Sequence, residues 1–152
     1  MNQAFKKAVE QFTQKDPTFT LSTCSPDGQP HSAILYFALD DELNICFFTK
    51  QETQKSKNME ENPKVALLLQ NVAEQQALQM EGVVRKLTDS TEAHATFDLL
   101  MKALSGTTDW PPPAGKIDAG DVLIYKVEVK WARLGHFKGH DRDVFTQLIP
   151  EE

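Results

Sequence analysis

Short segments of strand composition, most of them separated by turns of hairpin length, restrict the fold of this chain more than any other feature. The clearest turn, Ser25-Pro26-Asp27-Gly28, combines a proline that presets one φ angle with a glycine that accepts a positive one. Six segments have strand character: residues 18–24, 31–39, 43–49, 65–69, 76–87 and 121–133. This pattern predicts an antiparallel and mainly β protein.

Two of these segments also indicate which side chains are buried, and a third contains a predicted irregularity. In residues 121–133, Val127, Val129 and Trp131 alternate with charged residues, so the three apolar side chains are expected to share one buried face. Residues 65–69 are apolar without interruption, which is typical of a strand buried on both faces. Gly82 interrupts residues 76–87 and predicts a bulge or a sharp bend.

Three short helices are expected between the strands. Asn2 would cap the first, residues 53–62 favour a second that Pro63 ends, and residues 89–92 begin a third. The 152 residues fit one domain, residues 1–152. A closed or nearly closed antiparallel barrel would bury the apolar strands and leave few open edges, although an open α+β sheet also agrees with the pattern.

The charge balance restricts the partners. With 16 basic and 22 acidic side chains, the formal net charge is −6, which disfavours binding to the polyanionic backbone of a nucleic acid. The longest apolar run is too short to span a membrane, and the first seven residues lack the apolar core of a secretory signal. We therefore expect a cytoplasmic protein in which Cys24 and Cys46 are free, buried thiols.

The stretch from Phe48 to Asn58 contains the best candidate for a binding site. A strand ends at Thr49 and a helix begins at Thr53. The free backbone N–H groups at the start of this helix, and the positive end of its dipole, would attract an anion. The Thr49 and Thr53 hydroxyls and the Lys55 ammonium would complete a site for one phosphate monoester. A capped surface helix with solvated lysines explains the same residues without a ligand.

Several motifs occur in a characteristic order along the chain. Residues 20–31, the pair Phe48-Thr49, residues 55–67 and residues 81–86 together resemble the pyridoxamine 5'-phosphate oxidase-like family of FMN-binding split barrels, including its small general-stress-protein-like members. The resemblance is best over residues 18–87. It implies a six-stranded antiparallel split β-barrel with Greek-key topology and flanking short α-helices, and a homodimer that binds two FMN molecules at the subunit interface.

The resemblance also implies roles for individual residues. Contacts with the cofactor would come from Ser32, Ala33, Ile34 and Leu35 along the flavin ring, from Phe48 and Thr49, from Thr53 and Lys55 at the phosphate, and from Gln79 toward the partner subunit's flavin. Gln54 stands where the family has an arginine, so a bidentate phosphate donor is lost. The glutamines of residues 75–79 otherwise form an exposed strand face.

The tail resembles the substrate-binding segment of true oxidases. Residues 138–142 match an Arg-x-His-Asp-Arg pattern with lysine in the first place, which makes His140 and Arg142, together with Tyr36, candidate substrate contacts. The longer N-terminal region and the full C-terminal strand arrangement of the true oxidase are missing, so that activity is disfavoured. His136 and His140 have i, i+4 spacing, but no third ligand has a suitable spacing and no metal site is expected.

The expected function is that of an FMN-dependent oxidoreductase acting on an unidentified small molecule. The cofactor would supply the redox chemistry, and no side chain is assigned as a catalytic acid or base. Two alternatives stay open. One is a non-catalytic flavin-binding or stress-associated protein, and the other is a relative that holds a deazaflavin or haem in the same barrel.

Overall fold

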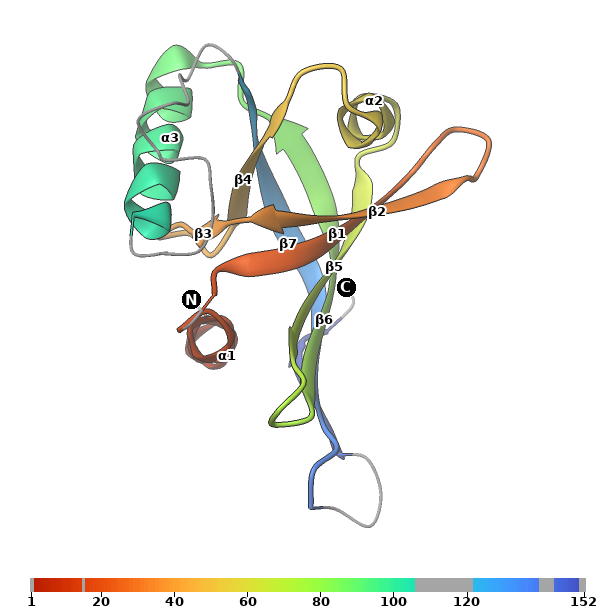
Figure 1. Ribbon diagram of the computed structural model, residues 1–152, viewed down its shortest axis with the longest axis vertical. Coiled ribbons are helices and arrows are strands. Elements are labelled where there is room, and N and C mark those ends of the chain that lie inside the picture. Colours follow the sequence, from red (N-terminus) through yellow and green to blue (C-terminus); the bar gives the residue numbers. More distant parts are fainter. Residues whose placement is uncertain (1, 15, 106–121, 140–143, 151–152) are drawn as a thin grey trace.

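The computed structural model describes residues 2–14, 16–105, 122–139 and 144–150, which form three helices and eight strands (Figure 1). The helices are α1 (Gln3–Phe12), α2 (Gln54–Glu61) and α3 (Ser90–Leu104). The strands are β1 (Thr18–Cys24), β2 (Pro30–Tyr36), β3 (Ala38–Leu39), β4 (Ile45–Lys50), β5 (Lys64–Asn71), β6 (Gln76–Lys86), β7 (Val122–His136) and β8 (Val144–Ile149). The capping residues expected for α1 and α2, Asn2 and Thr53, both occupy the N-cap position.

All strands pair antiparallel in one sheet with the order β2-β1-β5-β6-β7-β4-β3, and β8 pairs with β7 outside this path. Strands β2 and β3 lie at opposite ends of this order, yet Phe37 alone separates them in the chain. The chain therefore joins the two ends of the sheet, which curls into a half-barrel (Figure 1). This arrangement confirms the expected mainly β, antiparallel split barrel.

The described residues form eight strands, so the expected number of six is wrong. The return strand expected over residues 31–39 is interrupted at Phe37, whose side chain is 2% exposed and meets the Phe19 ring edge-on at 5.3 Å. Beyond this point Ala38 and Leu39 pair with β4 and no longer with β1. In the tail, β8 adds a further strand along β7.

A bulge in the pairing of β6 with β7 confirms the irregularity predicted at Gly82. The register passes from Glu81 opposite Trp131 to Gly82 opposite Val129, so the alternation on β7 reverses at this point. Val127 and Val129 point toward the core, but Trp131 lies on the outer face with the exposed Glu81. The expectation that all three apolar side chains share one buried face is therefore wrong for Trp131.

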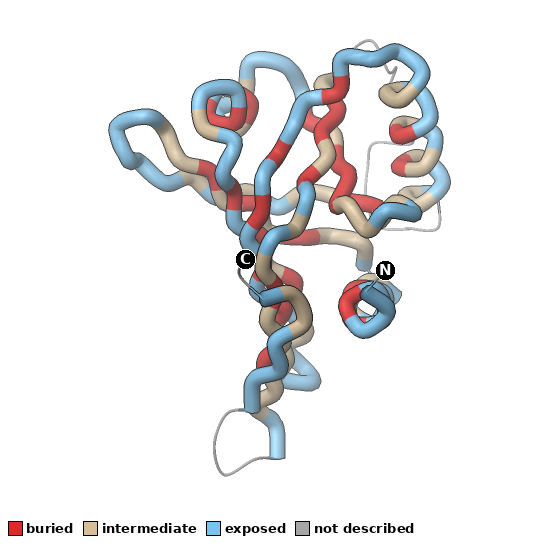
Figure 2. The backbone as a smooth tube through the Cα atoms, turned by 180° about the vertical axis from the view of Figure 1, so that it is seen from behind, coloured by how far each residue is buried: buried red, intermediate tan, exposed pale blue. Residues whose placement is uncertain are grey.

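Strand β5 is buried on one face only. Val65, Leu67 and Leu69 point inward and are buried, whereas Ala66 is exposed and Leu68 is half-buried on the outer side. The expectation of burial on both faces is wrong because the outward side chains of β1, β5 and β6 are exposed or half-buried, so that buried and less buried positions alternate along these strands (Figure 2).

Two groups of buried residues form the core. The larger group lies inside the curled sheet, where the rings of Phe47 and Tyr125 stack with their centroids 5.3 Å apart. The smaller group lies between α3 and the sheet and contains Cys46, whose pKa burial raises to about 12. Both cysteines are free, as expected, although Cys24 is only half-buried. No helix among the described residues is long and apolar enough to cross a membrane.

Candidate functional site

The end of β4 and the start of α2 bring the two predicted threonines together. Thr53 has an extended backbone and caps α2 by accepting a hydrogen bond from the Ser56 backbone N–H at 3.2 Å. Thr49, the fifth residue of β4, is 4% exposed, and its Oγ1 lies 3.4 Å from Thr53 Oγ1. Because Ser56 Oγ also donates to the Thr53 carbonyl oxygen, at 2.8 Å, the first turn of α2 holds Thr53 firmly beside β4.

Lys55 lies in this first turn as a half-buried cation, and burial lowers the pKa of its ammonium group. The first turn carries no acidic side chain, and no ion pair within the described ranges includes Lys55. A cation beside the positive end of a helix dipole is destabilised until an anion binds. Two hydroxyls, free backbone N–H groups and this ammonium therefore fit one phosphate group.

The remaining polar residues of α2 fix the helix to the sheet. The Gln54 amide donates to Asn58 Oδ1 at 2.9 Å, and Asn58 Nδ2 donates to Thr23 Oγ1 at 3.0 Å. Asn58 and Thr23 are both buried, at 2% and 3% exposure, so this pair anchors α2 on β1. The side chain of Gln54 is thus held along its own helix.

The four residues predicted to line a flavin ring divide between two faces of β2. Ser32 and Ile34 point outward and are exposed, Ile34 to 72%. Leu35 points inward and packs against the core, and Ala33 shares its side of the strand. Only Ser32 and Ile34 can therefore offer side chains to a ligand on the outer face, whereas Ala33 and Leu35 can offer backbone groups.

Gln79 lies on the same outer face as Ile34 but three strands away. The register runs from Ile34 through Thr20 and Leu68 to Gln79, which places the ends of this row roughly 14 Å apart at the usual strand spacing. One flat ligand at Ile34 does not reach Gln79 of the same chain. The contact of Gln79 with the partner subunit's flavin stays a prediction.

Phe48, Tyr36 and the tail complete the predicted residues. The Phe48 ring packs against Phe97 of α3, with centroids 6.4 Å apart, so its side chain belongs to the smaller core group and not to the surface of α2. Tyr36 is half-buried at the end of β2, opposite Thr18. His140 and Arg142 lie outside the described residues.

Arg133 is a candidate functional residue that the sequence pattern did not reveal. Its guanidinium carbon lies 4.3 Å from the centroid of the Phe145 ring and 5.6 Å from that of Trp131, and its Nη2 donates to Gln79 Oε1 at 2.9 Å. Its Nε is buried and has no hydrogen-bond partner. The bulge next to Trp131 places these groups on the outer face, and such a reversal has no reliable local signal in sequence.

Two cavities, of about 600 and 610 Å³, occur within the described part of the chain. The first lies between α1, β3 and α3, and the second lies beside α2 and contacts Ser56 and Lys57. Neither of these two cavities is lined by Thr49, Thr53 or Lys55.

The curled antiparallel sheet, closed by the chain at Phe37 and bearing α2 over β1, defines the class of split barrels. A family model described as pyridoxamine 5'-phosphate oxidase matches residues 5–135, and the chain belongs to this family. It is 35% identical over 85 residues to the pyridoxine/pyridoxamine 5'-phosphate oxidase of Cupriavidus pinatubonensis, a match that covers 56% of this chain and 40% of the relative. The chain thus spans less than half the length of this curated relative.

Solved structures of similar fold carry different names. An F420 reductase is 26% identical in sequence to this chain and superposes with a TM-score of 0.59. The match covers 79% of this chain and 91% of the reductase chain. A pyridoxamine 5'-phosphate oxidase-related, FMN-binding protein from Nostoc punctiforme has a TM-score of 0.64 at 12% identity. The match covers 97% of this chain and 96% of the Nostoc chain. HutZ, a haem storage protein from Vibrio cholerae, has a TM-score of 0.62 at 14% identity, covering 82% and 89%. The last two likenesses show the fold alone.

Proposed function

We propose that the chain is an FMN-binding flavoprotein and an oxidoreductase on a small molecule, with the flavin held at the interface of a homodimer. The observation that carries this proposal is the anion site at the start of α2, where Lys55 is half-buried without an acidic partner among the described residues. The family name and the FMN-binding relative support FMN as the occupant. The two unpaired cysteines suit the cytoplasmic location that belongs to the proposal.

In this proposal each group of residues has a defined task. Thr49, Thr53 and Lys55 hold the phosphate, because the hydroxyls donate hydrogen bonds and the ammonium supplies the opposite charge. The outer face of β2 around Ile34 contacts the ring, and Gln79 faces the flavin that the other subunit holds. FMN, when bound, supplies the redox chemistry, while the chain positions it and excludes water from one side.

The test compares two flavins that differ by a phosphate. Replacing Lys55 by alanine should weaken FMN binding by roughly tenfold to a hundredfold, the usual effect of losing a charge-assisted hydrogen bond, and should leave riboflavin almost unchanged. Lys57→Ala is the matched control, because Lys57 is exposed in the same helix. Titration followed by flavin fluorescence measures both affinities. Equal losses for FMN and riboflavin would place the phosphate elsewhere.

A deazaflavin or haem is the second candidate occupant, and the F420 reductase at 26% identity supports its inclusion. Gln54, bound to Asn58, leaves the phosphate site with one cation in place of two, which weakens the preference for FMN. Mass identification of the ligand released from the purified protein distinguishes the candidates. A protein that holds FMN tightly, but whose flavin no reductant and no small-molecule donor reduces, would instead be a flavin-binding protein without catalysis.

A further inference from the structure

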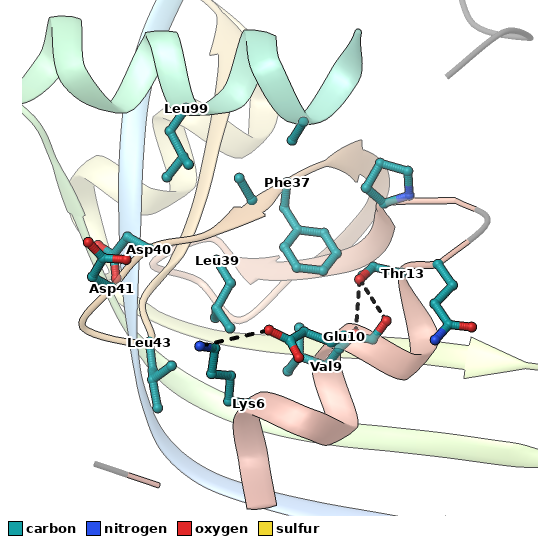
Figure 3. A pocket seen from close by; sticks show the side chains of 14 residues that line it. Lys6, Val9, Glu10, Thr13, Phe37, Leu39, Asp40, Asp41, Leu43 and Leu99 are labelled. Carbon is teal, nitrogen blue, oxygen red and sulfur yellow. Dashed lines mark hydrogen bonds and ion pairs between the residues drawn. The ribbon is translucent and has the colours of Figure 1, made fainter. Parts of the chain in front are cut away.

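The cavity between α1, β3 and α3 is separate from every residue assigned to the flavin. Its volume of about 600 Å³ lies within the range of sites that bind small molecules. Figure 3 shows α1 on one side, α3 on the other, and the chain from Phe37 to Leu43 between them. No lining residue comes from α2, β6 or β7.

The base of this cavity is apolar. Two of its lining residues, Val9 and Phe37, are buried, with 1% and 2% of their surface exposed. Leu39 and Leu99, each half-buried, add to this apolar lining (Figure 3). Such a surface favours a hydrocarbon or aromatic body, because its burial removes apolar area from water.

One wall of the cavity is held in a strained conformation. Leu43 has a φ of 65°, in the left-handed region that a bulky side chain rarely occupies. Asp40 stabilises this turn, because its backbone oxygen accepts from the Leu43 N–H at 3.0 Å and its Oδ1 accepts from the Asn44 N–H at 2.8 Å. A glycine would relieve the strain but would remove the apolar wall.

The mouth carries one carboxylate that nothing in the described chain neutralises. Lys6 Nζ lies 4.0 Å from Glu10 Oε1, so these two charges neutralise one another. Lys126 Nζ lies 2.9 Å from Asp40 Oδ2 and neutralises that carboxylate. Asp41 is exposed, lines the same cavity, and takes part in no ion pair within the described ranges. The mouth is therefore complementary to a single positive charge.

We propose that this cavity binds a small organic cation, namely an apolar body that carries one ammonium group. The body would contact Phe37, Leu39 and Leu99, and the ammonium would lie at Asp41. This site is independent of the proposed flavin site, because the two share no residue.

The test is a titration of the full ¹⁵N-labelled chain with three probes of equal skeleton: 2-phenylethylamine, 2-phenylethanol and 3-phenylpropionate. The amine should bind about tenfold more tightly than the alcohol, the value of one exposed charge-assisted contact, and the propionate should bind most weakly. The amide resonances of α1, residues 37–43 and the end of α3 should shift.

Two variants decide whether the assigned residues are responsible. Asp41→Asn should weaken the amine about tenfold and leave the alcohol unchanged, whereas Asp98→Asn, on the exposed side of α3 away from the cavity, should change neither. Ala103→Phe should fill the cavity and weaken both. The proposal fails if the amine does not bind at millimolar concentration, if amine and alcohol bind equally, if the propionate binds best, or if the shifts lie outside the cavity.

Discussion

Lys126 connects two acidic side chains from different elements. Its Nζ lies 2.9 Å from Asp40 and 3.5 Å from Glu92 of α3, and Glu92 also accepts two hydrogen bonds of 2.8 Å from Arg85. The bonds from Arg85 lower the pKa of Glu92 to about 2. Burial raises the pKa of Asp40, but the Asn44 N–H and Lys126 outweigh burial and lower it overall. These carboxylates therefore fasten α3 to the sheet.

This network predicts a specific loss of stability in acid. A folded-state pKa of about 2, against 4.5 for the free side chain, gives stability that is complete above 4.5 and is lost as the pH falls toward 2. Glu92→Gln should destabilise the protein by about 1 kcal/mol at pH 7, since solvent screens the pair, and by much less at pH 2.5. Urea unfolding of both proteins at pH 7 and at pH 2.5 measures this loss of stability. Glu128→Gln, at an exposed pair with Lys130, is the control, and equal losses for both variants would contradict the assignment.

The sequence pattern predicted that Thr49, Thr53 and Lys55, the residues proposed to hold the phosphate, lie together, because they are close in the chain. Thr49, Thr53 and Lys55 fall within seven residues, so a strand end and a helix cap are sufficient to bring them together. Arg133 could not be predicted in the same way. Its orientation depends on a bulge and on contacts with Gln79 and Phe145, which are remote in sequence.

Among the elements, those defined by local signals were predicted closely. Capping residues set the start of each helix, and Pro63 follows the end of α2. The errors occur where pairing between distant segments decides whether a strand forms and where it ends. Strand β2 ends at Tyr36 because its neighbour β1 begins at Thr18, and β3 and β8 exist only through their pairing with β4 and β7. Partner choice of this kind is not written in any short window of sequence.

Gly82 of β6, which faces the bulge in β7, provides a sharp test at this scale. A Cβ atom at Gly82 would lie 2.5 Å from the Glu128 carbonyl oxygen and 2.7 Å from Val127 Cγ1, and a backbone atom cannot move aside easily. Gly82→Ala should therefore destabilise the protein by about 2–4 kcal/mol, or prevent folding, through overpacking. Val83→Ala, at the adjacent and 41% exposed position, should cost less than about 1 kcal/mol. Thermal unfolding compares them. Equal stabilities would show that the bulge accepts a side chain.

For the molecule as a whole, the uncovered outer face suits a second copy of the chain. Ile34, Leu68 and Ala66 lie on that face, with Ile34 72% exposed. In the proposed homodimer, Ile34→Glu should shift the protein toward monomer and weaken FMN binding together, because a buried charge without a partner is costly. Sedimentation velocity and flavin titration measure the two effects.

The matched control for this variant is Val72→Glu, because Val72 is 77% exposed but lies in the turn between β5 and β6. It should leave both the oligomeric state and the FMN affinity unchanged. A wild-type monomer, or an Ile34→Glu variant that dimerises normally, would contradict the proposed interface.

The position of β7 in the chain has a consequence for synthesis on the ribosome. This strand pairs with β6, β4 and β8, and among the described strands it alone links β3 and β4 to the remaining sheet. Every strand from β1 to β6 leaves the ribosome earlier, so the nascent chain exists for a time as two separate pieces with open edges. Closure of the barrel therefore comes late in translation. In a chain that terminates before Val122, β4 and β6 would both lack their partner β7, and such unpaired strand edges favour aggregation.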